Sequence, residues 1–175
     1  MYMRDVWVNT GASPTVFRYV DWLITVPLQI VEFYLILAAV TKVSANLFWK
    51  LLIASLVMLV GGYAGEVGYA DVGPAFFVGM AGWLYIIYEI FKGEASQINE
   101  NSGNPASQQA FKTIRAIVTF GWAIYPIGYY LAYMSGGTHN SEALNIIYNL
   151  ADLVNKAAFG LAIWVAATSD SEQTA

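Results

Sequence analysis

Five long apolar segments limit what this chain can fold into more than any other feature of its sequence. Each is long enough to cross the roughly 30 Å hydrocarbon core of a bilayer as an α-helix. Charge is too scarce to cover a soluble domain, because 58% of the 175 residues are hydrophobic and only 11% are charged. The sequence therefore predicts an all-α membrane protein, with spans over about 14–39, 46–64, 73–92, 109–134 and 143–168.

The composition also argues against several classes of function. A formal net charge of −4 disfavours binding to nucleic acid. The sequence has no GxxxxGK[ST] phosphate loop, so we expect no nucleotide partner. The chain has no cysteine, and its single histidine, His139, reads as a solvated loop residue. We therefore expect no metal site and no thiol nucleophile.

Basic residues give the predicted spans an orientation. Five of them fall in the first-to-second and third-to-fourth connections, which share one side of the membrane, whereas the opposite side holds only Arg4. Because cytoplasmic loops carry the excess of lysine and arginine, we expect the first side to be cytoplasmic. The N-terminus is then outside and the C-terminus cytoplasmic. The five residues are Lys42, Lys50, Lys92, Lys112 and Arg115.

Two carboxyl groups in the first span are candidates for function, because a charge in the membrane costs about 2.5–3.5 kcal/mol to insert. Asp21 and Glu32 are eleven residues apart. They lie within about 20° of one another around a helix and about 16 Å apart along its axis. Two carboxyls stacked on one face are suited to passing a proton. The alternative is that Asp21 only pairs with Arg18 and that Glu32 lies at the inner interface.

The last span places a lysine in the middle of the bilayer. Asp152 and Lys156 are four residues apart and share a helix face. An ion pair with Asp152 would lower the cost of the buried amine without explaining why a lysine is there. A lysine amine removed from water can form a Schiff base with an aldehyde. Asp21 and Asp152 would then act as its counterions.

Aromatic residues on three spans are consistent with a long, flat aldehyde. The fourth span carries Trp122, Tyr125 and Pro126, which form an aromatic face with a kink. The first span adds Trp22 and the third adds Trp83. Aromatic planes around an interior lysine suit a polyene. The same spacing also occurs in ordinary helix packing, and that alternative stays open.

Three stretches of the sequence resemble segments of the microbial rhodopsins. Residues 18–28 (RYVDWLITVPL) are similar to their third helix, 121–126 (GWAIYP) to the sixth and 144–156 (LNIIYNLADLVNK) to the seventh. Within that family, essentially the whole chain resembles the proteorhodopsins, in particular those of the blue-absorbing kind. This implies a seven-transmembrane rhodopsin bundle of which about five helices are present, in a single domain over 1–175. We therefore expect a partial sequence that lacks the first two helices.

The resemblance also implies a function. The chain would be a light-driven outward proton pump, not an enzyme, with all-trans-retinal held by Lys156 as a protonated Schiff base. Asp21 would be the counterion and proton acceptor, and Glu32 the cytoplasmic proton donor. Gln29 would tune the colour toward blue. Asp152 would be a second counterion and Arg18 would couple to both, while the retinal pocket would be lined by Trp22, Met58, Trp83, Trp122, Tyr125, Pro126 and Asn155.

Two other functions remain as alternatives. The first is a retinal-based photosensor that signals without net ion transport, and the second is a membrane transporter or scaffold without a chromophore. Lys156 argues against the second, and a carboxyl at Glu32 favours the pump over the sensor. We expect the protein in the inner membrane of the cell, as a homo-oligomer within the lipid bilayer.

Overall fold

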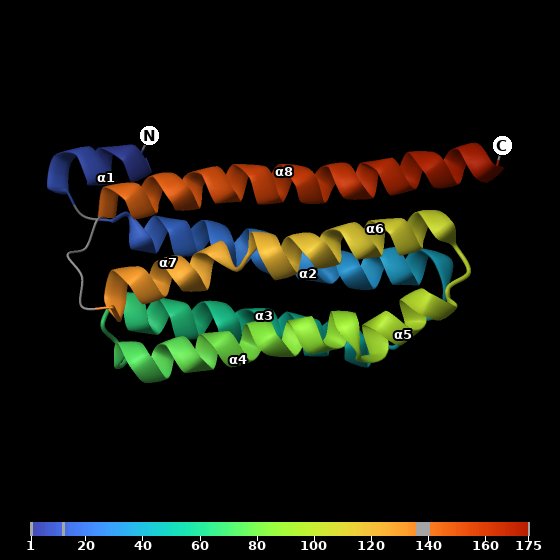
Figure 1. Ribbon diagram of the computed structural model, residues 1–175, viewed down its shortest axis with the longest axis horizontal. Coiled ribbons are helices and arrows are strands. Elements are labelled where there is room, and N and C mark those ends of the chain that lie inside the picture. The colour runs from blue at the N-terminus through green and yellow to red at the C-terminus, as the bar shows by residue number, and fades with distance from the viewer. Residues whose placement is uncertain (1, 12, 136–140, 175) are drawn as a thin grey trace.

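The computed structural model describes residues 2–11, 13–135 and 141–174, and His139 lies outside this part. All of the regular structure in the described residues is helical, which confirms the predicted all-α class. The helices run side by side along one axis (Figure 1). In chain order they are α1 (Tyr2–Thr10), α2 (Thr15–Val40), α3 (Ala45–Glu66), α4 (Val72–Phe91), α5 (Glu94–Asn101), α6 (Pro105–Ala116), the π-helix η1 (Ile117–Gly121), α7 (Ile124–Tyr133) and α8 (Ser141–Thr174).

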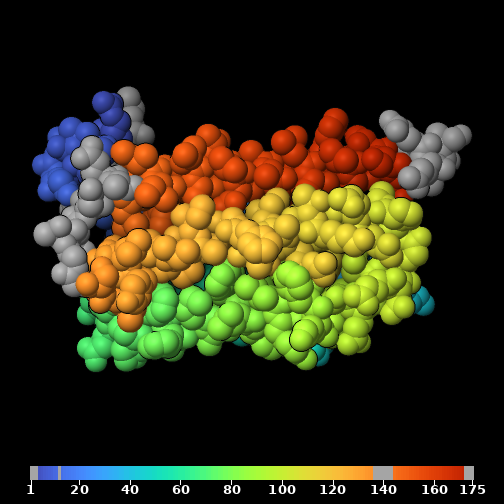
Figure 2. Space-filling view, viewed as in Figure 1, coloured from blue at the N-terminus to red at the C-terminus, as the bar shows by residue number. Residues whose placement is uncertain are grey.

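Among the residues that the structure describes, four helical stretches are long and apolar enough to cross a membrane: Thr15–Val40, Ala45–Glu66, Val72–Asn101 and Leu144–Ser171. The segment expected over 109–134 consists of α6, η1 and α7, which follow one another along the bundle (Figure 1). Seen from one side, α8, the α6–α7 segment and α4 form successive layers of an elongated body (Figure 2). This arrangement is that of a multi-pass membrane protein.

Helix α2 shows how the surface is adapted to lipid. Its outward side chains are apolar, and Val20, Ile24 and Leu28 are each more than half exposed. Its inward side chains include Trp22 and Phe33, which are buried. Because lipid chains are as apolar as leucine, this exposed surface carries no penalty in a bilayer.

Helices α3 and α4 touch through glycines. A Cβ atom on Gly82 would lie 2.7 Å from the carbonyl oxygen of Ala54 and 2.7 Å from the amide nitrogen of Met58. A Cβ on Gly61 would lie 2.8 Å from the nitrogen of Gly79. Small residues that let two backbones approach this closely are typical of helix pairs in membranes.

The π-helix η1 interrupts the segment between α6 and α7, near the kink that Pro126 predicts. The Trp122 amide donates to the carbonyl of Ile117, five residues earlier. Two side chains from other helices bind carbonyls of this turn. Trp83 Nε1 donates to the Val118 oxygen at 3.0 Å, and Asn155 Nδ2 donates to the Gly121 oxygen at 3.1 Å. Such π-turns are frequent at functional sites.

Candidate functional site

The side-chain amine of Lys156 on α8 lies between two carboxyl groups. Its Nζ donates to Asp21 Oδ2 on α2 at 2.5 Å and to Asp152 Oδ2 on α8 at 3.3 Å. The structure therefore brings together three residues that the sequence had singled out on two spans 135 positions apart. The amine thus has one carboxyl group from α2 and one from α8 as hydrogen-bond acceptors.

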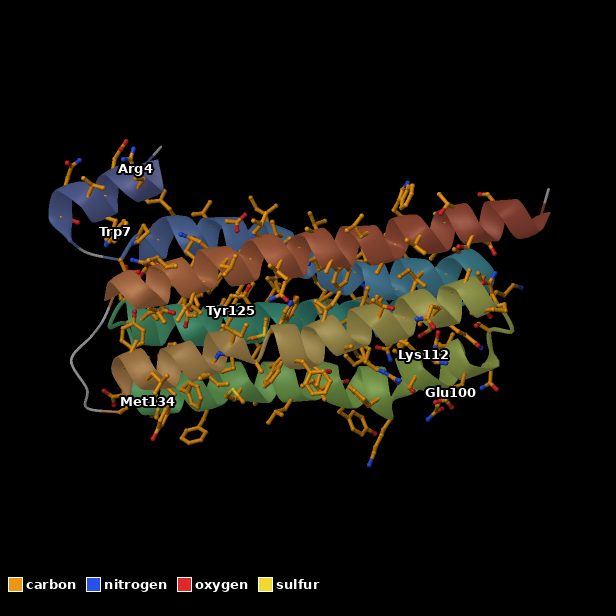
Figure 3. All side chains as sticks on the ribbon, turned by 45° about the horizontal axis from the view of Figure 1, so that its top comes forward. Arg4, Trp7, Glu100, Lys112, Tyr125 and Met134 are labelled. Carbon is orange, nitrogen blue, oxygen red and sulfur yellow. The ribbon has the colours of Figure 1, made fainter. Side chains whose placement is uncertain are left out.

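The two carboxyls differ in their other partners. Asp152 is already bound by the indole of Trp22, whose Nε1 lies 3.2 Å from Oδ1 and 3.0 Å from Oδ2. Tyr125, labelled in Figure 3, donates from its hydroxyl to Asp152 Oδ1 at 2.6 Å. Within the described part of the chain, the Asp21 carboxylate accepts a hydrogen bond from Lys156 alone. Asp152 is therefore held in place by Trp22 and Tyr125 as well as by the amine, whereas the hydrogen bond of Asp21 is to the amine.

Arg18 does not pair with Asp21 among the described residues. Its guanidinium is buried and donates to Asn145 Oδ1 and, at 3.3 Å, to Ser13 Oγ. It also lies over the ring of Tyr148, with 5.0 Å between its Cζ atom and the ring centroid. The alternative that Asp21 merely pairs with Arg18 is therefore wrong. Arg18 instead holds a separate polar group one helical turn away from Asp21.

Gln29 and Glu32 continue the same face of α2. Gln29 lies two turns beyond Asp21 and lines the cavity next to Lys156. Glu32 follows nearly one turn later, is half-buried and is not among the cavity-lining residues. The rings of Phe33, Phe111 and Phe159, from α2, α6 and α8, pack together with centroid separations of 5.2 and 6.1 Å. All three rings are buried, so an apolar cluster begins at the residue next to Glu32.

A cavity opens from Lys156 into the bundle. It encloses about 820 Å³ of space between side chains, counting the part that is open to the outside. All the expected pocket residues line it: Trp22, Met58, Trp83, Trp122, Tyr125, Pro126 and Asn155, together with Gln29, Asp152 and Lys156.

This cavity suits a long apolar aldehyde. Its walls are largely aromatic and apolar, with an amine that can bond the aldehyde carbon and two carboxylates that balance a cation there. The indole of Trp83 is held in place by its hydrogen bond to Val118. The residues present therefore fit retinal.

Several residues of the site were not singled out from the sequence. Asn145 accepts from Arg18, and Tyr148 donates to the Tyr125 carbonyl at 2.8 Å. Both belong to the 144–156 stretch, where the 3.6-residue period could have placed them on the face of Asp152 and Lys156. Tyr19 and Glu66 also line the cavity. Glu66 lies two residues beyond the predicted span 46–64, where an acidic residue resembles an ordinary charge at a span boundary.

Comparison with known proteins agrees with this geometry. The family model described as bacteriorhodopsin-like protein matches residues 1–170. A green-light absorbing proteorhodopsin from Gamma-proteobacterium EBAC31A08 is 56% identical over 171 residues. A blue-light absorbing proteorhodopsin from Gamma-proteobacterium Hot 75m4 is 57% identical over 172 residues. Each alignment covers 98% of this chain and 68% of the relative.

A solved structure is similar as well. The crystal structure of blue light-absorbing proteorhodopsin from Med12 superposes with a TM-score of 0.80 at 63% sequence identity, covering 97% of this chain and 74% of that one. The family carries a retinal chromophore in a multi-pass membrane fold, in agreement with the cavity and the Lys156 cluster. The chain belongs to the bacteriorhodopsin-like family, and its similarity within that family is to the proteorhodopsins.

Proposed function

We propose that the chain is a light-driven outward proton pump that uses all-trans-retinal bound to Lys156. One observation carries this proposal: an amine lies 2.5 Å from Asp21, and a third carboxyl, Glu32, stands farther along the same helix face. Bound retinal would supply light absorption and a change of shape that alters the surroundings of the Lys156 Nζ proton.

The first step is the transfer of a proton from Lys156 Nζ to Asp21 Oδ2. Asp21 is the better acceptor because Asp152 already accepts hydrogen bonds from Trp22 and Tyr125. Those bonds keep Asp152 in place as a fixed negative charge beside the amine. Arg18, one turn away, adds a positive charge that favours the return of Asp21 to its ionised form afterwards.

Glu32 would return a proton to Lys156 from the other side. The buried rings of Phe33, Phe111 and Phe159 pack together, and Phe33 directly follows Glu32 in the sequence. In the pump this apolar cluster would keep Glu32 from returning a proton to Lys156 before Asp21 has taken the first one, and it would have to loosen before Glu32 can donate. Release toward Asp21 and uptake from Glu32 then give transport in one direction, outward by the charge-derived orientation.

The membrane arrangement is part of the proposal. Five spans in one domain, with the C-terminus cytoplasmic in the inner membrane, follow from the apolar lengths and the basic connections. The side chains of Asp21 and Lys156 remain 38% and 30% exposed. A charge that faces lipid is costly, so we propose that further helices of a seven-helix bundle cover this side. Association into a homo-oligomer would cover the outer apolar faces.

Gln29 supports absorption of blue light. Its amide lines the cavity, where a polar group beside the polyene opposes the movement of charge away from Lys156 on excitation. Overall identity does not decide the colour, because the green- and blue-absorbing relatives are 56% and 57% identical. The proposal for blue absorption therefore depends on this side chain.

Illumination of cells that express the protein from its entire reading frame, with all-trans-retinal added, tests the function. We expect the medium to acidify in the light and a protonophore to abolish the change. Asp21→Asn should stop pumping, whereas Asp71→Asn, a change at an exposed carboxyl before α4, should not. A coloured protein that cycles in light but moves no protons would replace the pump with the photosensor.

A further inference from the structure

Three basic residues lie where the end of α4 packs beside α6. The guanidinium of Arg115 on α6 donates to the Ile90 carbonyl at 3.3 Å, and its Cζ atom lies 4.5 Å from the centroid of the Phe91 ring. Lys92 follows Phe91 and is the residue that ends α4. Lys112, labelled in Figure 3, is three residues before Arg115 and is therefore its neighbour on the surface of α6. Two helices thus contribute to one basic cluster, made up of Lys92, Lys112 and Arg115.

The carboxylates nearest to this cluster in the sequence have other partners. Glu89, in the last turn of α4, accepts from the Tyr85 hydroxyl and from the Glu94 amide, each at 3.0 Å. Its Oε1 lies 3.8 Å from Lys50 Nζ, and Glu94 pairs with the same amine at 3.2 Å. Among the described side chains, no ion pair joins a carboxylate to any member of the basic cluster. Its positive charge is therefore not balanced by the described part of the protein.

Arg115 has hydrogen-bond donors to spare. A guanidinium carries five N–H groups, and the Ile90 carbonyl is the one acceptor found for them in the described part of the chain. The carbonyl and the Phe91 ring hold the group at the edge of α4. The planar fork of a guanidinium matches two oxygens of a phosphate. Lys92 and Lys112 are exposed and add two point charges that also suit a phosphate.

The cluster lies at the level of the membrane surface, above an apolar face. The predicted span 73–92 ends here, and the predicted span 109–134 begins here. Tyr88 and Phe91 on α4 and Phe120 on η1 are all exposed aromatic side chains. In a bilayer such a face contacts the acyl chains, and basic residues at its end meet the headgroups. A soluble anion would use the cations but would leave this aromatic face without a role.

We propose that the basic cluster binds the phosphate of one anionic phospholipid, in the cytoplasmic leaflet by the charge-derived orientation. The Arg115 guanidinium binds two phosphate oxygens, Lys92 and Lys112 neutralise the remaining charge, and the acyl chains lie along the exposed aromatic face. The lipid thereby joins the end of α4 to α6. This site is separate from the retinal cavity and does not depend on pumping, so a protein that moves no protons would still bind the lipid.

The test is native mass spectrometry of the protein expressed from its entire reading frame, in detergent with phosphatidylglycerol or phosphatidylcholine added. We expect one phosphatidylglycerol to bind in preference to phosphatidylcholine. A basic residue at a membrane surface strengthens the binding of anionic lipid about fivefold, so Lys112→Gln should weaken it about fivefold. Lys92→Gln and Lys112→Gln together should weaken it about 30-fold. Arg115→Lys keeps the charge but loses the planar fork, and should also weaken binding.

Lys42→Gln is the matched control, because it removes an exposed lysine at the same end of the bundle, from the connection between α2 and α3. This variant should bind phosphatidylglycerol as the parent does. An equal loss in Lys42→Gln and Lys112→Gln, or no preference for phosphatidylglycerol in the parent, overturns the inference. Inorganic phosphate at the concentration of the lipid should not displace it, and displacement would replace the lipid with a soluble anion. If Arg115→Lys does not fold, the double lysine variant decides, because it leaves the packing of Arg115 on α4 intact.

Discussion

Gly82 offers a sharp test of how the packing of α3 against α4 supports the pocket. An added Cβ would lie 2.7 Å from backbone atoms of Ala54 and Met58. Ordinary contact begins at 3.4 Å, so Gly82→Ala must push the two backbones apart by about 0.7 Å. Neither neighbour is a flexible side-chain end that could turn away. Overpacking of this kind costs about 1–3 kcal/mol, or roughly 5- to 150-fold in the folded fraction.

Gly160→Ala is the matched control for this substitution. Gly160 is also inside a long helix, α8, but no described atom beyond its chain neighbours and the nearby backbone of its own helix lies within 4 Å of its Cβ position. Both variants gain the same helix propensity, about 0.5–1 kcal/mol. Their difference in unfolding free energy is therefore the overpacking cost of about 1–3 kcal/mol.

Denaturation in mild detergent, followed by circular dichroism, would measure this difference. Because Met58 lines the cavity, Gly82→Ala should also shift the visible absorption of the pigment, while Gly160→Ala should not. Equal stability and equal colour in the two variants would refute the close contact between α3 and α4.

Three further predictions concern the cavity and its surroundings. Lys156→Ala should leave a colourless protein in the presence of retinal, and a pigment that survives would end the assignment of the attachment site. Gln29→Leu should move the absorption maximum to longer wavelength without changing the direction of pumping; a shift to shorter wavelength would mean that the amide does not act on the polyene. Asn155→Leu leaves the partly buried Gly121 carbonyl without its donor, so the free energy of unfolding should fall by about 1–3 kcal/mol. A stable Asn155→Leu protein would show that the π-turn holds without this bond.

The sequence alone determined the features that depend on local periodicity. Apolar length is a property of each segment, so the all-α membrane class followed from the sequence, and the structure confirms it. The eleven-residue spacing of Asp21 and Glu32, and the four-residue spacing of Asp152 and Lys156, fix which side chains share a helix face. These spacings depend only on the geometry of one helix. These spacings indicate Asp21, Asp152 and Lys156 as site residues, but they do not give the distances between the two helices.

Only the tertiary structure decided how those faces meet. Arg18 binds Asn145, 127 residues away, instead of Asp21, which is one turn away on its own helix. Glu66 joins Tyr19 from another helix. Such partners depend on the rotation and depth of each helix relative to its neighbours. Hydropathy and spacing carry no information on that rotation, because they describe each helix separately.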